Sequence, residues 1–216
     1  MLPKCESNAR TAGGQPSCST GNLATVEEHD ASEEVLALYQ EFRAKFGRAD
    51  VPGILRCFGT HPPLLRAMMD LASSMLFVDG ALTRKQKEMV ATYVSLRNAC
   101  PYCAGSHGHF FLEQGGTTAM LTALQKGRLA ESEFTDAEQV LLRFTEQVNK
   151  DSNSIRRTDV EAVQQAGWSD LQIAETIHMV ALFAAFNRIA NAFGLPSQEL
   201  LSLGCTTPVQ ESSSGS

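Results

Sequence analysis

The chain has 216 residues, of which 43% are hydrophobic and 19% charged, and a formal net charge of −6. This balance is typical of one globular domain and excludes the charge-rich, apolar-poor composition of a disordered protein. The acidic charge, without a cluster of Lys and Arg, excludes the electrostatic footprint of a nucleic-acid or anionic-membrane binder.

The longest apolar run, residues 179–186, is far shorter than the roughly 20 residues that cross a bilayer. The N-terminus also lacks the apolar core of a secretory signal. We therefore expect a cytoplasmic protein with neither membrane nor nucleic-acid partners.

Both ends of the chain are polar and rich in small residues. Residues 1–24 contain many Ser, Gly, Asn, Thr and Pro residues, and residues 205–216 have the same character. The sequence predicts disordered tails over 1–24 and 205–216, on either side of one helical domain over 25–204.

Helix signals follow one another between these tails, and no convincing alternating strand occurs. Four segments open on Ser or Thr followed three residues later by Glu or Gln, the arrangement of a capping box: Thr83/Gln86, Thr135/Glu138, Thr158/Glu161 and Ser169/Gln172. With glycines as stops, we expect an all-α bundle with helices at about 33–46, 62–77, 83–98, 101–114, 117–125, 135–148, 158–166 and 169–193. Segments 83–110 and 169–193 share a capped start and a long apolar body, which suits an internal duplication.

The six cysteines are too scattered for a disulfide scaffold, and two of them form a close pair, Cys100-Pro101-Tyr102-Cys103. A residue before proline disfavours the α conformation, whereas proline suits the first helical position. One helix should therefore end near Asn98 and the next begin at Pro101. Cys100 then lies at the N-cap and Cys103 at the third helical position, where backbone N–H groups and the helix dipole stabilise a thiolate.

Two further side chains fall near this pair. His107 is seven residues after Cys100 and four after Cys103, so the three share one stripe of a helix. Glu88 precedes Cys100 by twelve residues. We expect the two helices to run antiparallel. The first then rises roughly 15 Å from Glu88 to the turn and the second returns roughly 10 Å to His107, which brings the two side chains within reach of a hydrogen bond.

The spacing of Glu88, Cys100, Cys103 and His107 resembles the Glu-x11-Cys-x2-Cys-x3-His pattern of AhpD-like alkylhydroperoxidases in the carboxymuconolactone decarboxylase superfamily. The resemblance extends loosely over residues 25–203. It implies an AhpD-like orthogonal helical bundle that forms a homo-oligomer without haem, metal or other cofactor. It also implies that Cys103 attacks peroxide, that Cys100 resolves the product as a disulfide, and that Glu88 and His107 relay protons. Tyr102 departs from some characterised members, which have a histidine there.

On this basis the expected activity is that of a thiol peroxidase, which reduces hydrogen or organic peroxides and is restored by a dithiol donor such as a lipoyl-bearing or thioredoxin-like protein. Two other functions stay open: a carboxymuconolactone decarboxylase-like or lactone-processing enzyme, and a non-enzymatic redox-responsive oligomer. Three other interpretations of the cysteine pair are a glutaredoxin-type site, which needs a preceding β-strand, a zinc site completed by Glu88 or His109, and two merely structural cysteines.

Overall fold

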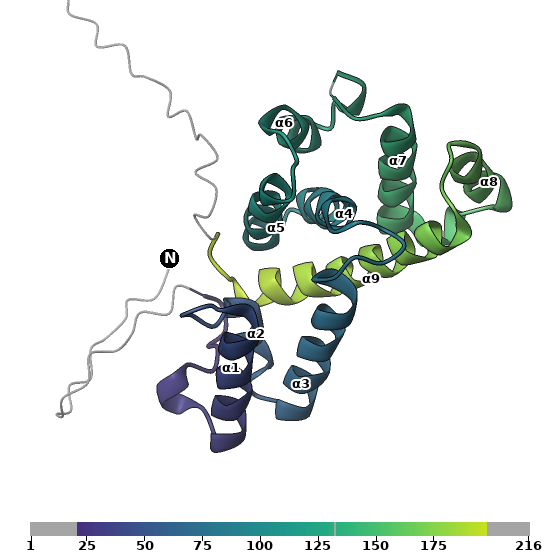
Figure 1. Ribbon diagram of the computed structural model, residues 1–216. Helices are drawn as coiled ribbons and strands as arrows, with labels where there is room; N and C mark the ends of the chain where they lie inside the picture. Colours follow the sequence, from purple (N-terminus) through teal and green to yellow (C-terminus); the bar gives the residue numbers. More distant parts are fainter. Residues whose placement is uncertain (1–20, 132, 198–216) are drawn as a thin grey trace, which may run out of the picture.

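The computed structural model describes residues 21–131 and 133–197, and this part of the chain is helical without a β-strand (Figure 1). Its α-helices are α1 (Glu33–Phe46), α2 (Gly53–Phe58), α3 (Pro62–Leu71), α4 (Arg84–Arg97), α5 (Pro101–Glu113), α6 (Thr118–Lys126), α7 (Asp136–Asp151), α8 (Arg157–Gln165) and α9 (Asp170–Phe193). Short 3-10 helices span Glu28–Asp30, Leu129–Glu131 and Ser152–Ser154, and a π-helical segment spans Ala72–Leu76. The predicted all-α class is confirmed.

The helix starts follow the predicted capping signals with one exception. Thr83, Thr135 and Ser169 cap α4, α7 and α9 in reciprocal capping boxes. The box expected at Thr158 and Glu161 is wrong, because the N-cap of α8 is Arg156, two residues before Thr158. There the carboxylate of Asp159 accepts a hydrogen bond of 2.7 Å from the backbone N–H of Arg156. An aspartate can satisfy a helix start from inside the first turn, and a search for Ser or Thr caps misses it.

A buried lysine fixes the segment that joins α3 to α4. Lys87 has no exposed surface, and its ammonium group donates to the carbonyls of Met75 (2.7 Å) and Val78 (2.9 Å). It also pairs with Glu175 of α9 at 2.7 Å. The predicted helix over 62–77 is an α-helix only to Leu71 and continues as the π-helical segment. The Met75 carbonyl in that segment accepts a hydrogen bond from Lys87.

Helix α9 lies between two groups of helices. In Figure 1, α1, α2 and α3 lie on one side of it, and α4 to α8 lie on the other. By length and hydropathy alone α9 could span a membrane, yet it packs against α2, α4, α5, α7 and α8 as a core helix. Helix α4 is equally central, since every residue from Lys87 to Ser95 is buried.

The remaining expectations concern the chain ends and the duplication. Residues 1–20 and 198–216 lie outside the described residues, so most of the predicted N-terminal tail and all of the C-terminal one do too. Segment 83–110 forms parts of two helices, whereas 169–193 forms one continuous helix. The two segments differ in structure, and the duplication stays a hypothesis about their sequences.

The turn between α4 and α5 contains a left-handed residue. Ala99 has φ 48°, a region that costs an L-residue with a Cβ atom roughly 1–2 kcal/mol. The backbone N–H of Cys100 donates to the carbonyl of Ser95 at 2.9 Å, which closes the end of α4. From α9, the Asn191 amide reaches the carbonyls of Asn98 (3.3 Å) and Ala99 (3.4 Å). Tertiary contacts thus hold a strained turn next to the first cysteine.

We predict that Ala99→Gly raises the free energy of unfolding by roughly 0.5–1 kcal/mol, because glycine adopts positive φ without a steric cost. Urea denaturation followed by circular dichroism measures the change. Ala37→Gly is the matched control: Ala37 is exposed within α1, so the same substitution should lower stability by roughly 0.5–1 kcal/mol. A loss of stability in both variants would contradict the strain at Ala99.

Candidate active site

The two cysteines lie where α4 ends and α5 begins, as predicted. Asn98 ends α4, Cys100 is the N-cap of α5, and Pro101 is its first residue. Both thiols are free and almost fully buried, with 1% of Cys100 and 3% of Cys103 exposed. Cys103 lines a cavity together with His107, whereas Cys100 lies behind it in the core.

Above a pH of about 7, the two cysteines hold one proton between them. A hydrogen bond from the Cys103 thiol lowers the pKa of Cys100 to about 7, although burial acts in the opposite direction. The backbone N–H groups of Cys103 and Tyr102, at the start of α5, and the side chain of Asn187 also lower the pKa of Cys100. The pKa of Cys103 is raised, because its thiol is the donor to Cys100, because it is buried, and because the charge on Cys100 repels a second thiolate. The negative charge therefore rests on Cys100, with Cys103 as its proton donor.

A buried amide completes the surroundings of the thiols. Asn187 on α9 is 1% exposed, and its oxygen accepts a hydrogen bond of 3.0 Å from the Asn98 amide. This contact turns the Asn187 amide nitrogen away from Asn98, so that it donates to Ser95 Oγ (3.0 Å) and faces both cysteines. Asn98 itself exchanges two hydrogen bonds with Asn149 of α7 (3.1 and 2.8 Å). The orientation of Asn187 is therefore set by Ser95 and Asn98 at the end of α4, and α7 holds Asn98 in turn.

The expected contact between Glu88 and His107 is present. Glu88 Oε2 lies 2.6 Å from His107 Nδ1, and the carboxylate has no exposed surface. Its other oxygen accepts from Arg84, one turn earlier on α4, through Nε at 2.8 Å and through Nη2. Since the carboxylate occupies Nδ1, Nε2 is the ring nitrogen that remains to exchange protons. The edge-to-face contact with Phe183, 4.6 Å between ring centroids, holds the imidazole plane.

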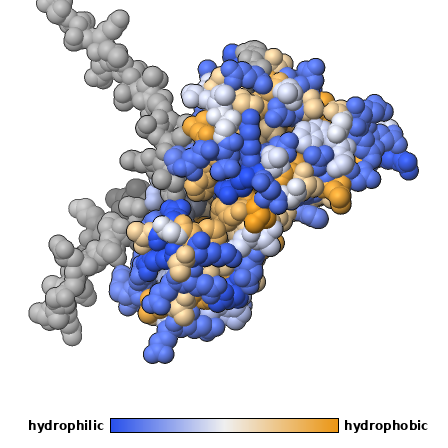
Figure 2. All heavy atoms as spheres, in the orientation of Figure 1, coloured by the Kyte–Doolittle hydropathy of each residue, from blue (hydrophilic) through white to orange (hydrophobic). Residues whose placement is uncertain are grey.

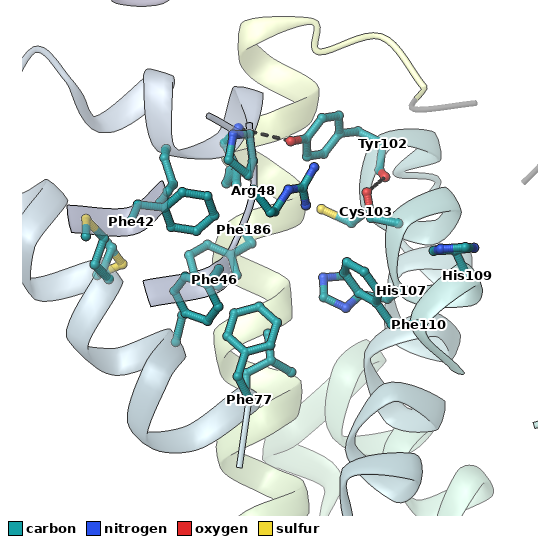
Figure 3. Close-up of a pocket in the computed structure, with 18 of the residues that line it drawn as sticks. Phe42, Phe46, Arg48, Phe77, Tyr102, Cys103, His107, His109, Phe110 and Phe186 are labelled. Atoms are coloured by element: carbon teal, nitrogen blue, oxygen red, sulfur yellow. Dashed lines mark hydrogen bonds between the residues drawn. The ribbon is translucent and has the colours of Figure 1, made fainter. Parts of the chain in front are cut away.

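Next to the cysteines, a cavity of about 550 Å³ separates the helices α1–α3 from α5 and α9. Figure 2 shows hydrophobic side chains gathered along this junction, on a face that is otherwise mostly hydrophilic. In Figure 3, Cys103, His107 and Phe110 line one wall, and Phe42, Phe46, Phe77 and Phe186 lie opposite or beside them. Tyr102 connects the walls, because its hydroxyl accepts a hydrogen bond of 3.2 Å from the backbone N–H of Ile54 in α2.

The sequence predicted the four candidate side chains, Glu88, Cys100, Cys103 and His107, but not the residues that hold them in place. Arg84 carries a signal that could have been used, since it lies four residues before Glu88 on the same helix. In the sequence Asn187 is only a polar residue within the apolar segment 169–193. The structure places it at the thiols, while its neighbour Arg188 donates to the carbonyl of Ala184 in the same helix at 2.7 Å.

Two alternative interpretations of the pair do not fit this geometry. A glutaredoxin-type site requires a β-strand before the first cysteine, and here helix α4 precedes it. Among residues 21–131 and 133–197, no group of three or more His, Cys, Asp or Glu side chains is placed to hold a metal ion. His109, one suggested zinc ligand, instead lies 3.2 Å from Glu113.

Comparison with known proteins supports the helical fold. Residues 62–147, which include all four motif residues, match the model of the carboxymuconolactone decarboxylase family. A peroxidase-related protein of Ralstonia eutropha, described as an alkylhydroperoxidase AhpD core, superposes with a TM-score of 0.73 at 23% identity, covering 83% of this chain and 94% of that one. A peroxidase-related protein of Silicibacter sp. gives 0.70 at 21% identity, covering 81% and 92%.

A more distant similarity involves a larger protein. Sestrin-2 of Mus musculus is 23% identical over 145 residues, which are 67% of this chain and 28% of Sestrin-2. The chain therefore spans less than a third of that relative's length.

The electrostatics of the pair predict one thiolate with a midpoint near pH 7. In a variant with Cys5, Cys18 and Cys205 replaced by serine, ultraviolet absorbance of the thiolate should rise with a midpoint at about 7, from Cys100. Cys57 should not contribute there, because burial raises its pKa to about 12. Asn187→Ala should shift the midpoint upward by roughly one pH unit, because the Cys100 thiolate then loses one hydrogen bond to a charged group. Asn153→Ala, at an exposed site, is the control, and an equal shift in both would contradict the role of Asn187.

Proposed function

We propose that this chain, which has an AhpD-like helical fold and matches the carboxymuconolactone decarboxylase family model over residues 62–147, is a thiol-dependent peroxidase. The observation that carries the proposal is the hydrogen-bonded pair of Cys100 and Cys103. Cys100 holds a thiolate near neutral pH, and Cys103 faces a cavity that His107 also lines. Thiolates are the nucleophiles that attack peroxides, and a second thiol within a turn of helix can resolve the product.

In the proposed first step the Cys103 sulfur attacks the terminal oxygen of a hydroperoxide. As it does so, its proton passes along the hydrogen bond to the Cys100 thiolate. The O–O bond breaks, Cys103 becomes a sulfenic acid, and the alkoxide leaves. His107 passes a proton from solvent to this alkoxide, and Cys100, whose pKa is about 7, loses its proton and becomes a thiolate again. Glu88 holds the imidazole in the tautomer that keeps Nε2 available, as an orienting carboxylate does in general-base catalysis.

In the second step the Cys100 thiolate attacks the Cys103 sulfenic acid. A disulfide forms, and hydroxide leaves and is neutralised as water. The two electrons that reduce the peroxide to an alcohol and water thus come from the two thiols. An external dithiol then restores the pair by exchange. We propose a lipoyl-bearing or thioredoxin-like protein as this donor.

Two further properties belong to the proposal. A homo-oligomer would cover the apolar side chains that α9 leaves at the surface, of which Leu171 is 74% exposed and Ile177 37%. A cytoplasmic location suits thiols that must be returned to the reduced state.

The family match also supports a second candidate, a decarboxylase or lactone-processing enzyme. Such an enzyme would use the same bundle without needing two thiols. Cys100→Ser separates the two functions, because only the peroxidase depends on the pair.

We predict that one equivalent of peroxide links Cys100 to Cys103 within one chain and that reduced lipoamide or thioredoxin supports repeated turnover. Peptide mapping by mass spectrometry detects the disulfide, and peroxide loss per chain measures turnover. Cys57→Ser is the control, since Cys57 is buried in α2 and takes no part in the cycle. A disulfide without turnover would favour the redox-responsive oligomer, and separate sulfonic acids on Cys100 and Cys103 would rule out the cycle.

We predict that Glu88→Gln lowers peroxide turnover by about ten- to a thousand-fold, the usual range for a proton-transfer contribution. His107→Ala should have a similar effect. The double variant should be little worse than either single one, because the two residues act as a unit. Raising the pH should partly restore each variant, since thiolate then forms without help. Full activity of folded Glu88→Gln near neutral pH would contradict the relay.

A further inference from the structure

The cavity beside Cys103 is much larger than hydrogen peroxide requires. Its volume of about 550 Å³ lies in the range of about 300–1,000 Å³ that holds whole organic ligands. Side chains from α1, α3 and the π-helical segment make much of the lining apolar, among them Phe42, Phe46, Met68, Met69 and Leu76. A ligand that fills this space therefore needs a sizeable apolar body.

The charged lining of the cavity is mainly positive. Arg48 and Arg84 contribute cations, and Glu113 is the acidic residue that lines it. The two arginines differ in their partners. Arg84 donates two hydrogen bonds to the buried Glu88 carboxylate, and its guanidinium carbon lies 4.7 Å from the Phe77 ring centroid. Its positive charge is therefore balanced by Glu88.

Arg48 is placed differently. It follows the end of α1, and its side chain is 29% exposed at the edge of the cavity. Its partner Asp50 is 68% exposed and lies 3.2 and 3.4 Å from Nη2, a surface pair that contributes little in water. In Figure 3 the guanidinium of Arg48 extends into the cavity in the direction of the wall that carries Cys103 and His107. A carboxylate inside the cavity could take the place of Asp50.

We propose that the cavity binds an amphipathic organic acid, with its carboxylate on Arg48 and its apolar body among the phenylalanines, and that the hydroperoxide of such an acid is the preferred substrate. The second half of this inference rests on the proposed function. The acid hydroperoxide is reduced to the matching hydroxy acid and water by the two electrons of Cys100 and Cys103.

Charge and burial act together in this recognition. A carboxylate paired with a guanidinium forms two charge-assisted hydrogen bonds, which a neutral ester cannot form. The cavity is partly closed, so the pair is screened less than one on the open surface. An acid and its methyl ester share the same apolar body and the same peroxide group, so that a difference between them isolates the contact with Arg48.

The test compares a long-chain fatty-acid hydroperoxide with its methyl ester, at concentrations below self-association, with hydrogen peroxide as reference. The wild-type protein should turn over the acid with a kcat/KM about tenfold above that of the ester, as one favourable ion pair gives. Arg48→Met should bring this ratio to about one by raising KM for the acid, and Arg48→Lys should keep part of it. Arg66→Met is the matched control, because Arg66 pairs with Glu41 on the outer surface of the same group of helices and should keep the ratio.

A binding measurement separates this inference from the peroxidase proposal. Calorimetry with the unreactive hydroxy fatty acid should show binding that Arg48→Met weakens about tenfold. Equal kcat/KM for acid and ester in the wild type, with hydrogen peroxide still consumed, would overturn the inference and leave the peroxidase standing. Binding of the hydroxy acid that depends on Arg48, without turnover of any peroxide, would overturn the peroxidase and support the ligand class. An acid preference that persists in Arg48→Met would overturn the assignment to Arg48.

Discussion

The buried carboxylate of Glu88 is the group on which the rest of the site depends. An ionised side chain without exposed surface costs several kcal/mol unless its oxygens find charged or hydrogen-bonding partners. Arg84 meets one oxygen from the same helix and His107 meets the other from α5. The second contact exists only if α4 and α5 pack closely, and buried Ala104, Gly105 and Gly108 on α5 leave room for that. The same packing that satisfies Glu88 therefore sets the position of the imidazole beside the thiols.

Lys87, the residue before Glu88, imposes a similar requirement on another face of α4. Its ammonium group is satisfied by two carbonyls of the segment after α3 and by Glu175 of α9. Glu175 is held in turn by the backbone N–H of Leu82 at 2.6 Å, just before α4 begins. Two adjacent buried charges thus connect the central helix to the wall of the cavity, to α9 and to α5. Removing either member of such a pair usually costs about 3–5 kcal/mol, because the partner stays buried and uncompensated.

Local signals predicted most helix limits because helix ends are decided by nearby atoms. Thr83, Thr135 and Ser169 each bind a backbone N–H three residues away, and Gly47 and Gly194 adopt positive φ. The sequence did not predict helix α2, because its six residues make fewer than two turns, too few for an apolar stripe to repeat. The meeting of Glu88 and His107 was predictable as well, since two helices joined at Cys100 bring residues at equal height together. Asn187 was not, because it lies 87 residues after Cys100 and only the packing of α9 brings it to the thiols.

The sequence by itself determined the helical class, the break at Cys100-Pro101 and the register of Glu88, Cys103 and His107, because each follows from contacts within a few turns of chain. Tertiary structure decided which sulfur holds the charge. That choice depends on the hydrogen bond between the thiols and on an amide supplied by α9. It also decided that Cys103 faces the cavity while Cys100 lies behind it, since the wall opposite Cys103 is formed by helices α1–α3, outside the motif. The spacing of residues along one helix sets the direction in which each side chain points. The burial and the charge of that side chain depend on the other helices that pack against it.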